Sequence, residues 1–452
     1  MAKTNTSTGG RAATTGIIPG RWALSVGKPS IPAPSGFNWT PLSEIARLES
    51  GHTPSRRNPE YWGGNVPWIG IKDATGNHGR TITSTLQTIT QAGLNNSSAR
   101  LLPAGTVCLS RTASVGYVVT MGSPMATSQD FINWVCGPEL SPRYLRYILV
   151  MEQDSVRRFA HGTTHQTVYY PEAKAFHVCI PSREEQDRIV STLGALDDKI
   201  AVNERIAAVC SELSRSHMEA MWAASPVGSL SNPDASVDGD WVVTTLDELC
   251  SAGGGSIQTG PFGSQLHASD YVDAGIPSVM PQNIGDNVIN EEGIARISED
   301  DATRLSKYLL QHGDIVYSRR GDVRRRALIR GRESGWLCGT GCLRVRPGNS
   351  VDSFFLSHYL SEPEIQDWIA RHAVGATMPN LNTKILGSVP VVLPPRAVRD
   401  EMSGVLSVLD ESSTAAIHES RTLAALRDTL LPELMSGRLR VKDAEKIVED
   451  NT

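Results

Sequence analysis

Long apolar stretches are missing from this chain of 452 residues, and so is the cysteine spacing of a metal or redox protein. No run approaches the roughly 18 apolar residues of a membrane span, and the N-terminus has no apolar signal segment. We therefore expect a cytoplasmic protein with no membrane contact. The seven cysteines are odd in number and contain no C-x-x-C pair, which favours buried thiols over a metal site or a disulfide framework.

Complete motifs of common catalytic sites are also absent. There is no G-x-x-x-x-G-K-[ST] loop, so we do not expect this chain to hydrolyse ATP. The fragment NPEY (58–61) lacks the glycine-rich cofactor loop of an amino-methyltransferase, HGTTH (161–165) lacks the glutamate of a zinc protease, and PEAK (171–174) lacks the acidic partner of a nuclease motif. We predict a non-catalytic chain that binds no metal and no cofactor.

Net charge is −5, which by itself argues against a nucleic-acid binder, but the charge is unevenly distributed. Seven arginines fall between Arg319 and Arg332 and are opposed only by Asp322, which gives this segment a local charge of +6. Two interpretations stay open at this point. The segment is a solvated charged face, or it contacts phosphates and base edges.

The sequence repeats itself. An L-x-x-G-x-[VI]-x-x-S-R pattern at 102–111 (LPAGTVCLSR) returns at 310–319 (LQHGDIVYSR), a shift of 208 residues. VPWIGIKD (66–73) matches IPSVMPQN (276–283), and Leu196-Asp197 matches Leu409-Asp410 at a shift of 213. The shift varies in the strand-rich parts and then stays constant, so length changes lie in loops while the segment that follows has a fixed length.

The pattern of apolar residues divides the chain into strand-rich and helical parts. We predict an α+β fold in which two mixed strand-rich domains are joined by two long antiparallel helices in a coiled-coil-like spacer, with a pseudo-twofold internal repeat. The expected segments are a flexible arm (1–36), a first domain (37–182), a central helix (183–224), a linker (225–240), a second domain (241–395), a second helix (396–436) and a tail (437–452).

Both helices show an apolar seam at alternating steps of four and three residues, close to that of a coiled coil. The two seams coincide when the first helix is shifted by 213 residues. Asn203 is a polar member of the kind that fixes register. The seam residues are Ile189, Leu193, Leu196, Ile200, Asn203, Met402, Leu406, Leu409, Leu423 and Leu430.

The doubled strand-rich domain, the helix entered through IPSREEQDRIVSTLGALDDKI (180–200) and the ending TLLPELMSGRLRV (429–441) resemble the specificity subunit of type I restriction-modification enzymes. The resemblance covers 37 to about 441. It implies two target recognition domains that each read half of a split double-stranded DNA target, and helices that set the half-site spacing and dock two methyltransferase subunits. It also implies adenine methylation with S-adenosylmethionine on those partners, and ATP and magnesium on restriction and translocase partners.

For contact with DNA we select polar loop residues that the repeat places in equivalent positions. Arg and Lys match guanine O6 and N7, and Asn and Gln match adenine N6 and N7. The first-domain candidates are Thr53, Ser55, Arg56, Arg57, Lys72, Arg111, Ser114, Thr163, Thr164 and Gln166. The second-domain candidates are Gln258, Ser264, Gln265, Gln282, Asn283, Arg319, Arg320, Arg324, Arg325, Arg326, Thr377, Asn380 and Asn382.

For any one of these residues, a structural turn or a phosphate contact remains the alternative to base reading. Arg111 and Arg319 recur in both copies while their surroundings differ, which favours backbone binding or a role in the fold. For the whole chain, the alternative function is a non-catalytic protein interaction scaffold of a related defence system that reads no DNA sequence.

Overall fold

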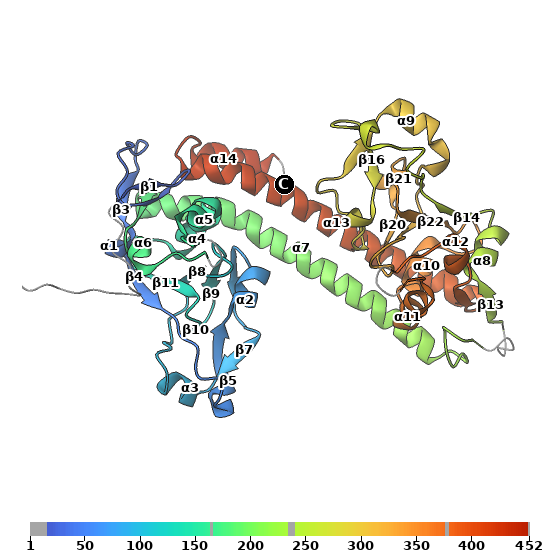
Figure 1. The fold of residues 1–452 in the computed structure, drawn as a ribbon, viewed down its shortest axis with the longest axis horizontal. Helices are drawn as coiled ribbons and strands as arrows, with labels where there is room; N and C mark the ends of the chain where they lie inside the picture. The colour runs from blue at the N-terminus through green and yellow to red at the C-terminus, as the bar shows by residue number, and fades with distance from the viewer. Residues whose placement is uncertain (1–15, 163–165, 234–239, 376–378, 451–452) are drawn as a thin grey trace, which may run out of the picture. The chain divides into compact units, whose positions relative to one another are not determined.

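The computed structural model describes residues 16–162, 166–233, 240–375 and 379–450. It separates into two compact units, the first comprising Met1–Val202 with Glu419–Thr452 and the second comprising Asn203–His418. Each unit contains one strand-rich domain with short helices, together with about half of each of two long helices (Figure 1). The predicted α+β class, with two strand-rich domains and two long helices, is therefore confirmed.

The first domain is built on a five-stranded sheet in the order β4-β11-β8-β9-β6. Its neighbours are antiparallel except for β6, which joins β9 in parallel. Buried apolar side chains lie on both faces of the inner strands, as expected for a sheet covered on both sides. The strands are β4 (Ala46–Ser50), β6 (Arg80–Ile82), β8 (Val107–Ser110), β9 (Val118–Met121) and β11 (Phe131–Cys136).

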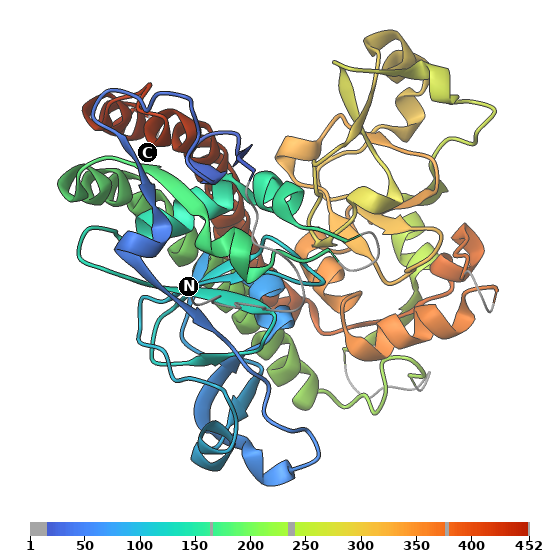
Figure 2. The ribbon, with the colours of Figure 1, turned by 60° about the vertical axis from the view of Figure 1, so that its left-hand side comes forward.

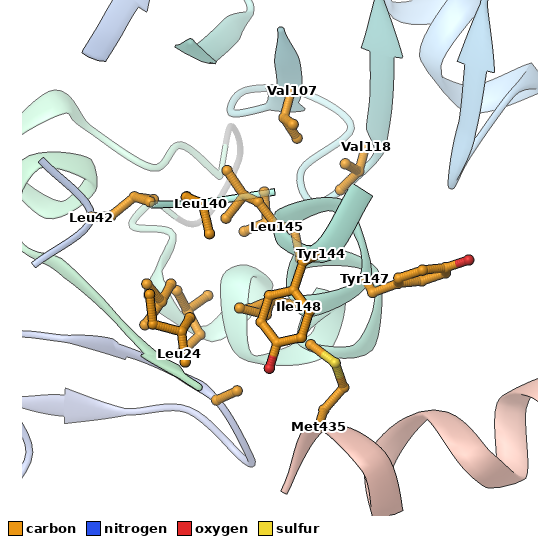
Figure 3. Close-up of a cluster of buried hydrophobic side chains, with 14 of the residues drawn as sticks. Leu24, Leu42, Val107, Val118, Leu140, Tyr144, Leu145, Tyr147, Ile148 and Met435 are labelled. Atoms are coloured by element: carbon orange, nitrogen blue, oxygen red, sulfur yellow. The ribbon is translucent and has the colours of Figure 1, made fainter. Parts of the chain in front are cut away.

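Helix α4 (Pro142–Met151) packs on this sheet. Its residues Tyr144, Leu145 and Ile148 are fully buried and lie on one face of the helix because they are one, three and four positions apart. Figure 3 shows them beside Val107 of β8, with Tyr147 directed away from the cluster. The other short helices and turns of the first domain are α1 (Leu42–Ile45), η1 (Pro59–Tyr61), α2 (Ile71–Gly76), α3 (Gln91–Asn95), α5 (Gln153–Phe159) and α6 (Tyr170–Lys174).

A second sheet of the first unit includes residues that precede the predicted domain. Its order is β1-β2-β12-β3, formed by β1 (Ile18–Pro19), β2 (Leu24–Val26), β12 (Phe176–Ile180) and β3 (Asn38–Pro41). Leu24 and Val26 belong to the same buried cluster as α4. The expectation of a flexible arm over 1–36 therefore fails for 18–26, and residues 1–15 lie outside the described residues.

The carboxylate of Glu152 holds this preceding segment in place. The residue is completely buried at the start of α5, and its oxygens accept hydrogen bonds from the backbone N–H groups of Arg21, Trp22, Ala23 and Leu24 at 2.6 to 3.2 Å. A buried carboxylate needs such donors, because removing a charge from water is costly unless it is hydrogen-bonded. The segment is thus part of the fold of the first domain.

A small lobe projects from the first domain on the side away from α4 and α5 (Figures 1 and 2, dark blue to cyan). It contains a three-stranded sheet in the order β10-β5-β7, together with η1 and α3. Strand β5 carries a bulge between Trp62 and Val66, where Gly63 adopts a left-handed φ of 78°. The strands are β5 (Trp62–Ile69), β7 (Gln87–Ile89) and β10 (Ala126–Thr127).

The second domain repeats this plan with different side chains. A five-stranded sheet has the order β14-β22-β19-β20-β17, and β13 pairs with β23. Strand β19 (Ile315–Ser318) corresponds to β8 in the repeat, and both end in the shared Ser-Arg pair. The other strands are β13 (Val242–Thr245), β14 (Ser256–Thr259), β17 (Asp286–Asn287), β20 (Arg326–Leu328), β22 (Cys342–Arg346) and β23 (Pro390–Leu393).

A four-stranded sheet, β15-β18-β16-β21, makes up the lobe of the second domain together with α9 (Figure 1, yellow). Its strands are β15 (Tyr271–Val272), β16 (Ile276–Val279), β18 (Ala295–Ile297) and β21 (Leu337–Cys338). The short helices and turns of the second domain are α8 (Leu246–Ala252), η2 (Ala268–Asp270), η3 (Pro281–Asn283), α9 (Glu299–Arg304), η4 (Ser306–Tyr308), η5 (Gly331–Glu333), α10 (Ser353–Tyr359), α11 (Pro363–His372) and α12 (Thr383–Gly387).

The long helices are α7 (Arg183–Ala223) and α13 (Arg396–Met435), and they pack antiparallel. In the first unit, the beginning of α7 shares a buried cluster with the end of α13, and Lys199 forms an ion pair with Glu419 at 3.4 Å. In the second unit, the end of α7 shares a cluster with the beginning of α13. Of the ten seam residues, Ile200 and Leu409 are half-buried and the others are buried, including Asn203 at 2% exposure.

The predicted linker (225–240) and the predicted tail (437–452) both contain residues that pack on a domain. Within the linker, Leu230 is buried, and Glu364 on α11 accepts hydrogen bonds from the N–H of Leu230 at 2.9 Å and from the hydroxyls of Ser229 and Ser231. Within the tail, α14 (Val441–Glu449) buries Val441 and Ala444 in the core of the first unit. None of the helices in the described part of the chain has the length and apolarity needed to cross a bilayer.

Candidate nucleic-acid interface

The end of the shared Ser-Arg strand meets the same returning loop in both domains. The N–H of Val168 donates to the carbonyl of Arg111, and the N–H of Leu381 donates to the carbonyl of Arg319, each at 2.8 Å. Each loop is closed by an antiparallel bridge, between His161 and Thr167 in the first domain and between Val374 and Asn380 in the second. Among the described residues, the structure therefore brings the Ser-Arg strand end next to the part of the returning loop that holds the candidate Gln166 in the first domain and the candidates Asn380 and Asn382 in the second.

Within this site, the side chain of Arg111 holds the fold together. It donates to the carbonyl oxygens of Gln129 at 3.1 Å and Val168 at 3.3 Å, and it lies 5.0 Å from the centre of the Tyr170 ring. Of the roles considered for this arginine, the hydrogen bonds support the structural one. Ser114 lies in the turn that follows, and its carbonyl accepts a hydrogen bond from the Ser110 hydroxyl.

The corresponding residues of the second domain are arranged differently. Arg319 is half-buried and its Nε has no hydrogen-bond partner among the residues that the structure describes, whereas Arg320 is exposed and bridges to Asn380 through the backbone. Asn382 caps α12, because its Oδ1 accepts the N–H of Ile385 at 2.8 Å. Gln166 of the first domain is exposed at the base of its loop. The candidates Thr163, Thr164 and Thr377 lie outside the described residues.

A second group of candidates lies in the loop that enters the small lobe of the first domain. The guanidinium of Arg56 lies 3.8 Å from the centre of the Trp62 ring and 5.5 Å from that of Trp68, and one of its nitrogens donates to Gln87 Oε1 at 2.8 Å. The two indole rings meet edge to face, with centres 5.1 Å apart. Arg56 is thus an exposed cation held between an aromatic face and a side-chain amide.

Neighbouring contacts hold the backbone of the same loop. The indole N–H of Trp62 donates to the carbonyl of Ser55 at 3.3 Å, and that of Trp68 donates to the carbonyl of His52 at 3.1 Å. The hydroxyl of Thr53 donates to Gln129 Oε1. Thr53 and Ser55 therefore have structural contacts, whereas Arg57 is exposed.

The turn beside this loop exposes a large apolar side chain. Leu86 is 72% exposed, although its backbone N–H is held at 2.8 Å by the buried carboxylate of Asp73. The same carboxylate accepts the N–H of Gly70 at 2.9 Å and so ties the turn to the start of α2, where Lys72 lies. Lys72, Thr83 and Leu86 line one surface groove.

In the second domain, Gln265 lies in the loop between β14 and β15 that enters the lobe. Its Oε1 accepts hydrogen bonds from the hydroxyl of Tyr308 at 2.8 Å and from the N–H of Phe262 at 3.2 Å. Phe262 is 54% exposed, and Ser264 is also exposed. The amide NH2 of Gln265 is left as the donor with which this side chain can bind a base edge.

Two further candidates of the second domain have structural partners. Asn283 is 1% exposed, and its side chain accepts the N–H of Met280 at 3.0 Å and donates to the carbonyl of Asn290 at 3.1 Å. Its burial contradicts the expectation that it faces DNA, since a buried amide with both ends bonded cannot reach a base. Gln282 beside it is exposed, and Gln258 on β14 is half-buried.

The arginine run does not form a uniform charged face. Arg324 pairs with Asp367 at 2.6 Å, Arg330 with Asp410 at 2.6 Å and Arg332 with Glu291 at 2.8 Å, while Arg325 is exposed. Much of the local charge of +6 predicted from the sequence is therefore neutralised by carboxylates that lie far away along the chain.

Arg326 is the clearest departure from prediction within this run. It is 3% exposed and donates two hydrogen bonds to the carbonyl of Ser357, at 2.9 and 3.2 Å. Burial lowers the pKa of Arg326, and burial together with Arg326 lowers the pKa of His358 to about 4. The interpretation of Arg326 as a DNA contact is therefore corrected, because its guanidinium belongs to the interior of the second domain.

Several residues that were not predicted from the sequence lie beside the candidates in the loops that enter the two lobes. They are Trp62, Trp68, Leu86 and Gln87 in the first domain, and Phe262 and Tyr308 in the second. An arginine followed within a dozen residues by two tryptophans (RRNPEYWGGNVPW, 56–68) is a local signal for aromatic stacking. No local pattern marks Leu86. Within the described ranges, no group of three or more His, Cys, Asp or Glu residues is placed to hold a metal ion.

Two strand-rich domains of one plan, each followed by a long helix that pairs antiparallel with the other, define a duplicated protein with two differing loop surfaces. The sequence matches the family of the type I restriction modification DNA specificity domain over residues 34–210 and 238–426. The chain therefore belongs to this family, and the resemblance noted from its sequence is confirmed.

Curated relatives and a solved structure agree with this assignment. The chain is 24% identical over 423 residues to the type I restriction enzyme MjaIX specificity subunit of Methanocaldococcus jannaschii, covering 91% of this chain and 95% of that protein. It is 29% identical over 157 residues to the HindI specificity subunit of Haemophilus influenzae, which covers 33% of each chain. The crystal structure of a type I restriction-modification S subunit from M. genitalium has the same fold, with a TM-score of 0.60 at 18% identity over 90% of this chain and 98% of that one.

Proposed function

We propose that this chain is the sequence-reading subunit of a type I restriction-modification complex, in which each domain reads one half of a bipartite double-stranded DNA target. The long helices set the gap between the half-sites and dock two methyltransferase subunits. S-adenosylmethionine binds those partners, ATP and magnesium bind restriction and translocase partners, and this chain supplies no catalytic residue.

One observation carries the proposal. In both domains the same backbone hydrogen bond joins the Ser-Arg strand end to the returning loop, while the polar side chains of the loop that enters the small lobe differ, Arg56 in one domain and Gln265 in the other. Two domains that read different DNA sequences need the same backbone support but different polar side chains, because side chains read the base edges.

The test is a binding titration of the full chain purified with its methyltransferase partner. We expect sequence-selective binding to duplex DNA whose affinity falls linearly on a logarithmic salt scale, with a slope that reports several phosphate contacts. Absent or sequence-blind binding would favour the interaction scaffold. Mapping methylated adenines in cells with and without the gene identifies the target, and an insertion of one helical turn beside Asn203 should change its gap.

A further inference from the structure

The loop 52–58 of the first domain presents one arginine in a fixed orientation. We propose, building on the function proposed above, that Arg56 is the residue with which the first domain distinguishes guanine from other bases. Trp62 and Gln87 act as its positioning residues. The inference concerns one contact in one half-site, so it can fail while the domain still reads DNA.

The guanidinium of Arg56 stacks on the ring of Trp62. At 3.8 Å from the centre of the Trp62 ring, the guanidinium is in van der Waals contact with the aromatic face. A stacked guanidinium loses much of its rotational freedom before DNA arrives, so less entropy is lost when it binds a base. An exposed arginine without such a contact lacks this preorganisation.

Arg56 also keeps hydrogen-bond donors available for a base. A guanidinium has five N–H donors, and among the described residues Arg56 gives one of them, to Gln87 Oε1 at 2.8 Å. Enough donors remain for a bidentate contact with O6 and N7 of guanine, the commonest specific contact in the major groove. Gln87 meanwhile fixes the rotation of the guanidinium in its own plane.

The backbone of the loop is held as firmly as the side chain. Both indole N–H groups donate to its carbonyls, at Ser55 and His52. Where the loop leaves β4, Gly51 is packed so closely that a Cβ there would lie 2.0 Å from the carbonyl oxygen of Ser128. The position from which Arg56 projects is therefore determined by the domain.

Arg57 provides a matched control within the same loop. It is exposed like Arg56, and its backbone N–H donates a hydrogen bond to the hydroxyl oxygen of Ser55 at 3.3 Å, but no ring lies against its guanidinium in the described part of the chain. We expect Arg57 to contribute charge without discrimination between bases.

The experiment uses the full chain with its methyltransferase partner and a pool of duplex DNA in which the half-sites are randomised. Bound sequences are read for the wild type and for the variants R56Q, R56K and R57Q. We expect R56Q to lower the preference for guanine at one position of one half-site by roughly ten- to hundredfold. R56K should show a similar loss, because lysine keeps the charge but not the planar fork.

R57Q should weaken binding to all sequences equally and reduce the salt slope by about one unit. The inference is overturned if R56Q keeps every base preference of the wild type, or if its loss is spread evenly over all positions. A wild-type complex that selects no sequence at all would instead refute the proposed function, so the two failures are distinguishable.

The positioning role has its own readout. W62L should reduce the preference at the same position as R56Q while leaving the other half-site and the salt slope unchanged, and W62F should restore most of it by keeping an aromatic face. The thermal unfolding midpoint of W62F serves as a check on folding. Equal preferences for wild type and W62L would remove Trp62 from the proposal.

Discussion

Arg330 donates two hydrogen bonds to the carboxylate of Asp410, at 2.6 and 2.7 Å, and so fastens the second domain to α13. The side chains are 13% and 6% exposed, so the pair is largely shielded from water. The equivalent aspartate of the repeat is Asp197 on α7. Its carboxylate accepts hydrogen bonds from the guanidinium of Arg146 on α4 at 3.1 Å and from the hydroxyl of Tyr147 at 2.6 Å. The anchoring aspartate is thus the same in both halves, although its partners come from different elements.

Replacing Arg330 by methionine should lower the free energy of unfolding by about 3 kcal/mol, because it leaves the buried carboxylate of Asp410 without its charged partner. Urea unfolding of the full chain measures the change. R325M is the matched control, since Arg325 is exposed, and it should stay within about 0.5 kcal/mol of the wild type. A loss for R330M no larger than that of R325M would show that the pair contributes little.

The turn after the Ser-Arg pair offers a stabilising substitution. Ala113 adopts a left-handed φ of 61°, and the matching residue of the second domain, Gly321, has a φ of 75°. A113G should raise the free energy of unfolding by about 0.5 to 1 kcal/mol, because an alanine Cβ is strained in this conformation. A104G, at a position outside the left-handed region, should instead destabilise slightly. Urea midpoints of the two variants test the sign, and a destabilised A113G would contradict it.

Glu152 should be essential for docking of the segment that precedes the first domain. E152Q replaces one acceptor oxygen by an NH2 that faces backbone N–H groups, so we expect a loss of about 2 to 3 kcal/mol. Limited proteolysis should then cut near Arg21, a site at which we expect the wild type to be protected. D154N is the control, because Asp154 on the same helix is 88% exposed, and a digestion pattern shared by both variants would argue against the carboxylate.

Gln265 should contribute to reading by the second domain alone. Its side-chain oxygen Oε1 accepts the hydroxyl of Tyr308, which leaves the NH2 as the group of this half-buried side chain that can donate to a base. Under the proposed function, Q265L should reduce the preference for one base of the second half-site by roughly tenfold and leave the first half-site unchanged. Sequencing of DNA bound from a randomised pool checks both statements, and an unaltered second half-site would exclude Gln265 as a reader.

Features that depend on periodicity or repetition could be predicted from the sequence. The Ser-Arg strands, the long helices and most of their buried seam follow from spacing alone, because a residue's position along a helix or strand decides which face it occupies. The equivalence of Asp197 and Asp410 also follows from the repeat. The family resemblance depended on the same features.

Features that depend on partners distant in the sequence could not be predicted. Nothing near Arg326 indicates that the carbonyl of Ser357, 31 residues away, takes its guanidinium into the interior. Likewise, residues 18–26 look flexible by composition, and the groups that order them, Glu152 and strand β12, lie about 130 or more positions later in the chain. The stacking of Arg56 on Trp62 requires the loop to fold back over β5, which the letters alone do not determine.

The hydrogen bonds by which Glu152 and Glu364 hold the segment preceding each domain determine where chimeric chains can be joined. Each domain binds residues that precede it in the chain, 21–24 in the first domain and 229–231 in the second. A junction at residue 37 or 241 would transfer a domain without the preceding segment, and Glu152 or Glu364 would then lose its backbone hydrogen-bond donors. Exchange points upstream of residues 17 and 227 would transfer each domain together with the preceding segment that it binds.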